Sequence, residues 1–164
     1  MERGATLSRD AKYRYNLWRV WKPGEGIVSW VMVNPSTADA QTDDFTTLKC
    51  VRFAKMWGFG GIQILNLFPY RAVDPKVLRQ VGREVAVGDP FLAEAHIVAG
   101  VGFSNLTVAA WGKHGQLWGR DKEVLAELLK HTDVHALQLT IDGTPYHPMN
   151  VKGSAYPFLW KSRL

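Results

Sequence analysis

The sequence has few of the features that mark secreted, membrane-anchored or disordered chains. Its 164 residues include one cysteine, Cys50, which excludes an internal disulfide. No apolar run approaches the roughly 18 residues of a membrane span, and residues 1–15 lack the apolar core of a secretory signal. Basic residues are scattered and form no block of like charge. We therefore expect a cytoplasmic protein with a single domain over residues 1–164.

Several catalytic signatures are also missing. No serine lies in a G-x-S-x-G turn, and no series of cysteines and histidines has the spacing of zinc ligands. The G-x-x-x-x-G-K-[ST] loop of nucleotide triphosphate-binding proteins is absent as well. These absences exclude the common serine hydrolases, zinc modules and P-loop enzymes, and we expect neither a metal nor another cofactor.

What is present favours an anionic partner. The net charge is +5, and aromatic residues make up 12% of the chain, with seven tryptophans. Basic side chains attract phosphates, and aromatic side chains that are not in the core can stack on bases. DNA is therefore the first partner to consider, although a solvated basic surface explains the charge equally well.

Alternating strand and helix patterns predict an α/β fold. Apolar or alternating stretches predict strands at residues 13–21, 27–33, 62–68, 105–111 and 134–140. Amphipathic stretches predict helices at residues 42–58, 89–101 and 119–131. Asp43 or Asp44 is expected to cap the start of the first helix, and Asp89 with Pro90 the start of the second. We expect a three-layer α/β/α domain with a central, mainly parallel four-stranded sheet. The first two strands are expected to pair as an N-terminal antiparallel hairpin across the turn at residues 22–26.

Unusual polar segments follow the predicted strands. They are Asn34-Pro35-Ser36, the segment from Asn66 to Tyr70, the segment from Trp111 to His114, and His147-Pro148. Because ligands bind beyond the carboxyl ends of parallel strands, we expect these segments to meet at one edge of the sheet.

The side chains in these segments suit a hydrolysis in which the leaving group departs as an anion. An asparagine such as Asn34 or Asn66 can hold a water or read the edge of a heterocyclic base. His147 can donate a hydrogen bond to an oxygen that becomes negative. None of the three is a good nucleophile, so we expect an activated water to attack.

The order of these motifs resembles that of the uracil-DNA glycosylase superfamily. Asn34-Pro35 resembles its water-activating motif, "ILNLF" carries Asn66 at the position of its base-reading asparagine, and His147-Pro148 resembles its C-terminal His-Pro turn. The pattern as a whole, over roughly residues 13–152, further resembles a bacterial and phage family known only as a domain of unknown function. The resemblance implies a uracil-DNA glycosylase-like fold and base excision by base flipping.

Two departures from the motifs change the expected substrate. Uracil-specific members carry a bulky tyrosine after the first proline, where this chain has Ser36, and a serine after His-Pro, where it has Met149. A small residue at position 36 leaves room for a substituent on the base. The resemblance therefore implies a glycosylase for a 5-substituted pyrimidine, such as a modified cytosine of phage DNA, with a role in anti-phage defence.

Each candidate residue receives an expected role. Asn34 and the backbone near Ser36 hold the attacking water, with Asp39 or Asp43 as its base, and His147 stabilises the departing base. The expected substrate-binding residues are Pro35, Ser36, Phe45, Asn66 and Phe68. The expected DNA-binding residues are Arg71, Lys113, His114, Met149 and Lys152. Since no lysine occupies an evident Schiff-base position, we expect a monofunctional enzyme that leaves an abasic site.

Structural roles are open to the same residues. Asn34-Pro35 can simply end a strand, and Asn66 can make a structural hydrogen bond. His147 and His114 can be ordinary loop histidines, and the aspartates can be helix caps. Two rival functions stay open as well: a nucleic-acid-binding module without catalysis, and a hydrolase of free nucleotides or nucleosides.

Overall fold

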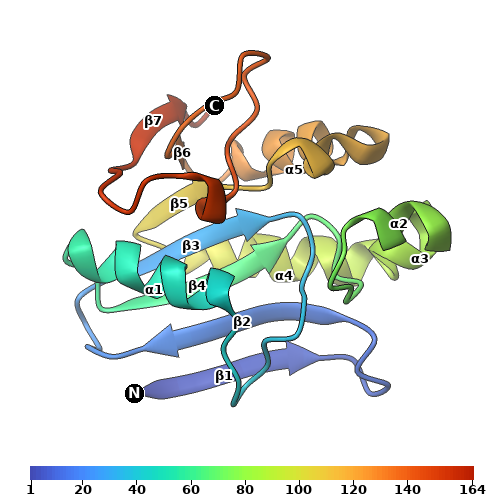
Figure 1. The fold of residues 1–164 in the computed structure, drawn as a ribbon, viewed down its shortest axis with the longest axis horizontal. Coiled ribbons are helices and arrows are strands. Elements are labelled where there is room, and N and C mark those ends of the chain that lie inside the picture. The colour runs from blue at the N-terminus through green and yellow to red at the C-terminus, as the bar shows by residue number, and fades with distance from the viewer.

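The computed structural model describes residues 1–164 and contains one seven-stranded sheet (Figure 1). The strands are β1 (Glu2–Leu7), β2 (Arg14–Val20), β3 (Ile27–Met32), β4 (Gly61–Asn66), β5 (Leu106–Ala109), β6 (Val134–Ala136) and β7 (Phe158–Lys161). Their order across the sheet is β1-β2-β4-β3-β5-β6-β7. Strand β3 pairs in parallel with β4 and β5, and β5 with β6, whereas β1–β2, β2–β4 and β6–β7 are antiparallel. The parallel strands therefore lie in the middle of the sheet.

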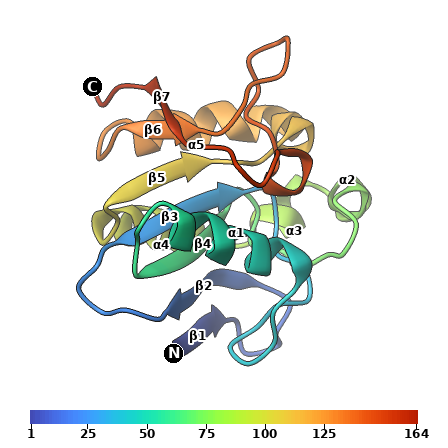
Figure 2. The ribbon, with the colours of Figure 1, turned by 60° about the vertical axis from the view of Figure 1, so that its left-hand side comes forward.

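Helices cover both faces of the sheet (Figures 1 and 2). They are α1 (Phe45–Met56), α2 (Lys76–Val81), α3 (Arg83–Val87), α4 (Pro90–Gly102) and α5 (Arg120–Leu128), with short 3-10 helices η1 (Lys113–Gly119) and η2 (Pro148–Asn150). Helix α1 packs Phe53 on one face, against Trp30 of β3. Helices α4 and α5 pack on the other face, where Ile97 and Leu128 join a core that includes Val31. The predicted mixed α/β class is confirmed.

The predicted N-terminal hairpin is wrong. Strand β2 pairs with β4, placing Leu17 opposite Ile64, and β3 lies on the far side of β4. The burial of the strands explains this order, because β3 is buried at every residue after Ile27 and needs a neighbour on each side. Strand β2 alternates between buried and half-buried residues, as expected for a strand nearer the edge. The sheet also contains β1 and β7, which were not predicted, so it has seven strands instead of the five predicted.

The predicted helix starts agree with the structure. Asp44 caps α1 by accepting a hydrogen bond from the Thr47 amide at 2.7 Å. Asp89 caps α4 through the Phe91 and Leu92 amides, with Pro90 as the first helical residue. Gly58 follows the end of α1 in a left-handed conformation (φ 87°), which a glycine adopts without strain. Asp44 and Asp89 therefore determine where α1 and α4 begin.

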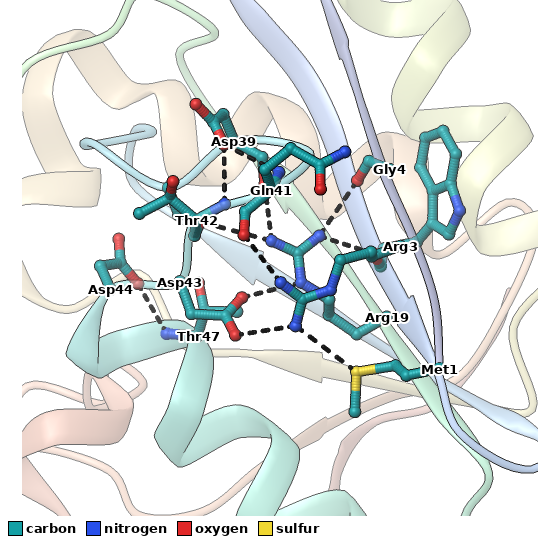
Figure 3. Close-up of polar contacts among 12 residues, drawn as sticks. Met1, Arg3, Gly4, Arg19, Asp39, Gln41, Thr42, Asp43, Asp44 and Thr47 are labelled. Carbon is teal, nitrogen blue, oxygen red and sulfur yellow. Dashed lines mark hydrogen bonds and ion pairs between the residues drawn. The ribbon is translucent and has the colours of Figure 1, made fainter.

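A buried arginine anchors the segment between β3 and α1 (Figure 3). The Arg19 side chain is fully buried, and its Nε donates to Asp43 Oδ1 at 2.8 Å. Its other nitrogens donate to backbone carbonyls, including those of Gly4, Asp39 and Thr42. Residues 39–43 are thereby attached to β2, and this attachment positions the start of α1.

The segment Arg83–Gly102 is long and apolar enough to meet the length and composition criteria for a membrane span, although a core helix of a soluble protein meets the same criteria. In the structure it forms two helices, α3 and α4, which are separated at Gly88 and Asp89. Ala93, Ile97 and Val101 of α4 lie in the core against the sheet, so packing accounts for the apolar face of this helix.

Candidate active site

A cleft of about 830 Å³ opens at the carboxyl ends of the parallel strands. All four polar segments contribute to it, through Asn34 after β3, Asn66 at the end of β4, Gly112 after β5 and His147 before η2. The predicted convergence of these segments is confirmed. It follows from the parallel pairing of β3, β4 and β5, because parallel strands end at the same edge.

Asn66 is the most unusual residue of the cleft. Its side chain is only 4% exposed, yet neither Oδ1 nor Nδ2 has a hydrogen-bond partner within the chain. Leaving a buried polar group unsatisfied costs about 1–3 kcal/mol. Arg14 Nε and Trp111 Nε1, which also belong to cleft-lining residues, are buried and unpaired too. Three residues of the cleft lining therefore carry buried polar atoms without a hydrogen-bond partner.

Asn34 is held in a single orientation. Its Nδ2 donates to the carbonyl oxygens of Pro35 at 3.0 Å and Ala72 at 2.9 Å. Because two carbonyls can only accept, these contacts identify the amide nitrogen and leave Oδ1 as the free acceptor. The Pro35 carbonyl also accepts from the Ala72 amide at 2.9 Å. The polar turn after β3 is therefore fixed against the chain that follows β4, and Asn34 presents an acceptor there.

His147 is set up as a hydrogen-bond donor. Its Nδ1 accepts from the Met149 amide at 3.2 Å, so the proton of the neutral ring lies on Nε2. Burial lowers the pKa of His147 below its ordinary value, and the opposing effect of Asp44 is smaller. At neutral pH the ring is therefore an uncharged donor.

This shift in pKa predicts a pH dependence of stability. Since the folded-state pKa is lowered, the contribution of neutral His147 is present above the unfolded value of about 6.5 and is lost as the pH falls through the folded value. The free energy of unfolding of the wild type should fall more between pH 7.5 and pH 5 than that of His147→Gln. Urea unfolding at the two pH values measures this difference. An equal fall in the free energy of unfolding for the two proteins would contradict the prediction.

Two charged residues of the cleft were not predicted from the sequence. Asp44 is the only acidic residue that lines it. Arg14 lines the cleft as well, is 3% exposed, and donates from Nη1 to the Ala38 carbonyl at 2.8 Å. Burial lowers the pKa of Arg14 to about 10, with Asp44 acting in the opposite direction, so the guanidinium stays charged at neutral pH. The Asp44 carboxylate thus acts electrostatically on two other residues of the cleft, the buried Arg14 and His147.

The predicted bases Asp39 and Asp43 do not line the cleft. Asp43 forms ion pairs with Arg19 at 2.8 Å and Arg3 at 3.2 Å (Figure 3). Asp39 Oδ1 accepts from the Gln41 and Thr42 amides, and these hydrogen bonds lower the pKa of Asp39. Both carboxylates stabilise the loop before α1, so neither is placed to activate a water in the cleft. This part of the sequence prediction is wrong.

The other predicted residues divide into two groups. Those that line the cleft are Ser36, Phe45, Lys113 and His114, in addition to Asn34, Asn66 and His147. Those that do not are Pro35, Phe68, Arg71, Met149 and Lys152. Phe45 is 81% exposed, which suits an aromatic surface for a ligand at the entrance. No group of three or more His, Cys, Asp or Glu side chains is placed to hold a metal ion.

The predicted residues that do not line the cleft lie in the core, at the turn after β3 or at the surface. Phe68 is fully buried in the core and contacts Trp118 edge-on, so it cannot touch a ligand. Pro35 is buried, and Arg71 donates from Nε to the Ser36 carbonyl at 3.4 Å, which stabilises the turn after β3. Met149 lines a separate depression beside α1, and Lys152 is exposed. The direct substrate contact predicted for Phe68 is therefore wrong.

Comparisons with known proteins give a family and no activity. No curated protein and no solved structure matches the chain. One protein family matches, over residues 14–149, a range that includes every cleft-lining residue except Asn150. The chain therefore belongs to the family described as Protein of unknown function (DUF1643).

Proposed function

We propose that this protein is a DNA glycosylase that flips out a 5-substituted pyrimidine nucleotide and hydrolyses its N-glycosidic bond, leaving an abasic site. The observation that carries the proposal is the buried, unpaired amide of Asn66 in the cleft. An amide presents one acceptor and a donor side by side, which matches the donor and acceptor pattern on the Watson–Crick edge of a pyrimidine. The parallel strands at the centre of the sheet are compatible with the uracil-DNA glycosylase-like fold that the motifs suggested.

Base recognition involves three residues of the cleft. Asn66 reads the edge of the flipped base, and the pairing removes the penalty of leaving its amide unsatisfied. Phe45 at the entrance stacks on the base or on its neighbour. Ser36 lines the cleft with a small side chain and leaves space for a substituent on the pyrimidine ring.

Three further residues of the cleft carry out the hydrolysis. Asn34 Oδ1 accepts a hydrogen bond from the attacking water. Asp44, the only carboxylate that lines the cleft, is the base for this water, a role that the sequence suggested for Asp39 or Asp43, and it also stabilises the positive charge that develops on the sugar. The bond between the sugar and the base breaks with its electron pair moving to the base, where His147 Nε2–H donates to the developing oxyanion. The water oxygen bonds to the sugar carbon, and the proton that the water loses passes to the Asp44 carboxylate.

The experiment that tests the proposal is an assay for abasic sites. Oligonucleotide duplexes and single strands carry uracil, mismatched thymine, 5-hydroxymethylcytosine or glucosylated hydroxymethylcytosine, and natural phage DNA with modified cytosine is included. After incubation, hot alkali cuts each strand at abasic sites. We expect cleavage on one or more 5-substituted pyrimidines, with a rate lower by about 100-fold or more in His147→Ala, Asn34→Ala and Asp44→Asn, as is typical when one stabilising group is removed.

The matched control is Asp43→Glu, which keeps a carboxylate beside Arg19 and lies outside the cleft. Its excision rate should stay close to that of the wild type. DNA binding without abasic sites on every substrate would overturn the proposal in favour of a non-catalytic binding module. Base release from free nucleosides or nucleotides but not from DNA would favour a nucleoside or nucleotide hydrolase.

A further inference from the structure

A second depression, of about 730 Å³, adjoins the cleft. Pro75, Lys113 and His114 line both, so the two are continuous along one wall. The remaining residues of this second depression are Lys76, Arg79, Gln80, Gln116, Leu117 and Trp118. We call it the α2–η1 groove, because α2 (Lys76–Val81) and η1 (Lys113–Gly119) supply most of its lining. Anything that leaves the cleft on this side passes through the groove.

The charge of the α2–η1 groove has one sign. Lys76, Arg79 and Lys113 are exposed, and no acidic residue is among the lining residues. None of the three cations takes part in any of the ion pairs of the structure. Cations without acidic partners keep their full attraction for a phosphate. The groove therefore suits an extended anion.

Trp118 adds an aromatic surface to the groove. The residue is 37% exposed, and its ring makes a T-shaped contact with the ring of the buried Phe68 at a centroid distance of 5.8 Å. The residue has a left-handed backbone conformation (φ 54°, ψ 23°), which is a strained state for a bulky side chain. A strained and partly exposed tryptophan beside free cations is better explained by a ligand than by packing, because Phe68 is the only aromatic side chain that its ring meets.

We propose that the α2–η1 groove binds the nucleic-acid strand next to the nucleotide held in the cleft. Lys76, Arg79 and Lys113 contact consecutive phosphates, and Trp118 stacks on a base. This inference rests on the proposed function, since it takes the ligand of the cleft to be one nucleotide of a longer strand. An acidic peptide would use the cations but would give Trp118 no base to stack on, so the aromatic ring favours a nucleic acid.

The test is fluorescence anisotropy with a labelled single-stranded oligodeoxynucleotide, titrated with the full-length protein at several salt concentrations. The first variant is the double substitution Lys76→Ala/Arg79→Ala, and the second is Trp118→Asn. Asparagine tolerates the left-handed conformation, so the second variant keeps the backbone of η1. The control is Arg9→Ala/Arg163→Ala, which removes the same charge from two exposed residues that line neither depression.

We expect the dissociation constant to rise about tenfold or more in each groove variant, and the control to stay within about twofold of the wild type. Each lost phosphate contact should reduce the slope of log K against log salt by about 0.7 for a single strand, so the double variant should lose about 1.4. The slope for Trp118→Asn should not change, because stacking releases no counterions. Groove variants that bind like the control, or a wild type that does not bind the oligonucleotide, would overturn the inference.

The same variants separate this inference from the proposed function. If the groove variants lose affinity while the wild type makes no abasic sites, the groove binds nucleic acid and the glycosylase proposal fails. If the wild type excises a base and the groove variants excise it with unchanged affinity and rate, the glycosylase proposal stands and the groove inference fails.

Discussion

Asn66→Ala should reduce base excision by about 100-fold or more while changing the free energy of unfolding by less than about 1 kcal/mol. The two effects separate because Asn66 makes no hydrogen bond within the chain, so its removal breaks no internal contact. It also relieves the folded state of two buried, unsatisfied polar atoms. A site that hydrogen-bonds its substrate discriminates strongly, so the loss should appear in kcat/KM for the modified base. Urea unfolding and the abasic-site assay on the same preparation measure both quantities.

Gln63 provides the matched control for Asn66. It lies on the same strand, β4, and is also a buried amide, but its Nε2 donates to Ser29 Oγ at 2.7 Å and to the Gly100 carbonyl. Gln63→Ala should therefore lower the free energy of unfolding by about 1–3 kcal/mol and leave excision by the remaining folded protein unchanged. If Asn66→Ala destabilised the protein as much as Gln63→Ala does, Asn66 would be a structural residue and the proposed function would lose its main support.

Arg19→Met should lower the free energy of unfolding by about 3–5 kcal/mol, as is usual when one partner of a buried ion pair is removed. The guanidinium is fully buried and donates to Asp43 and to the carbonyls of Gly4, Asp39 and Thr42, and the substitution removes all of these hydrogen bonds (Figure 3). For a chain of this length the loss corresponds to a fall in Tm of about 6–20 °C. Differential scanning calorimetry measures it.

Arg3 is the control for Arg19, since both pair with Asp43. The Arg3 side chain is 31% exposed, so water replaces the lost interaction, and Arg3→Met should cost less than about 1 kcal/mol. Similar losses of stability in the two variants would mean that burial of Arg19 does not strengthen its interactions. The excision rate of folded Arg19→Met should fall too, because the loop it anchors leads into Asp44 and Phe45.

The sequence was most informative where the signals are local. Helix caps such as Asp44 and Asp89 lie next to the amides they satisfy, so their positions predicted the helix starts correctly. The position of the cleft followed from one topological rule, the shared edge of parallel strands. Asn66 could be singled out because an amide inside an apolar strand stands out in the sequence.

What the sequence did not reveal depends on contacts between distant residues. Asp43 and Asp44 are neighbours with the same side chain, yet one pairs with Arg19 and the other lines the cleft. That difference arises from the path of the chain at the start of α1, which no pattern in the sequence specifies. Arg14 appeared as one basic residue among many, because its burial and its hydrogen bond to the Ala38 carbonyl arise only in the folded chain. Strand β1 has a single buried residue, Gly4, and strand β7 has none, so neither strand shows a strong apolar pattern.

The placement of β3 beyond β4 has a consequence for the order in which the chain folds. The β1–β2 hairpin is local in sequence and can form by itself, but its inner edge has no partner until β4 is made. Strands β3 and β4 are joined through α1, so their parallel pairing closes a longer loop and is slower. The hairpin can therefore dock only after β4 has been made, and β2 joins the sheet late although it is synthesised early. Until then the edge of β2, with Leu17 and Trp18, is free to pair with another chain, and this interval is when the protein is most prone to aggregate.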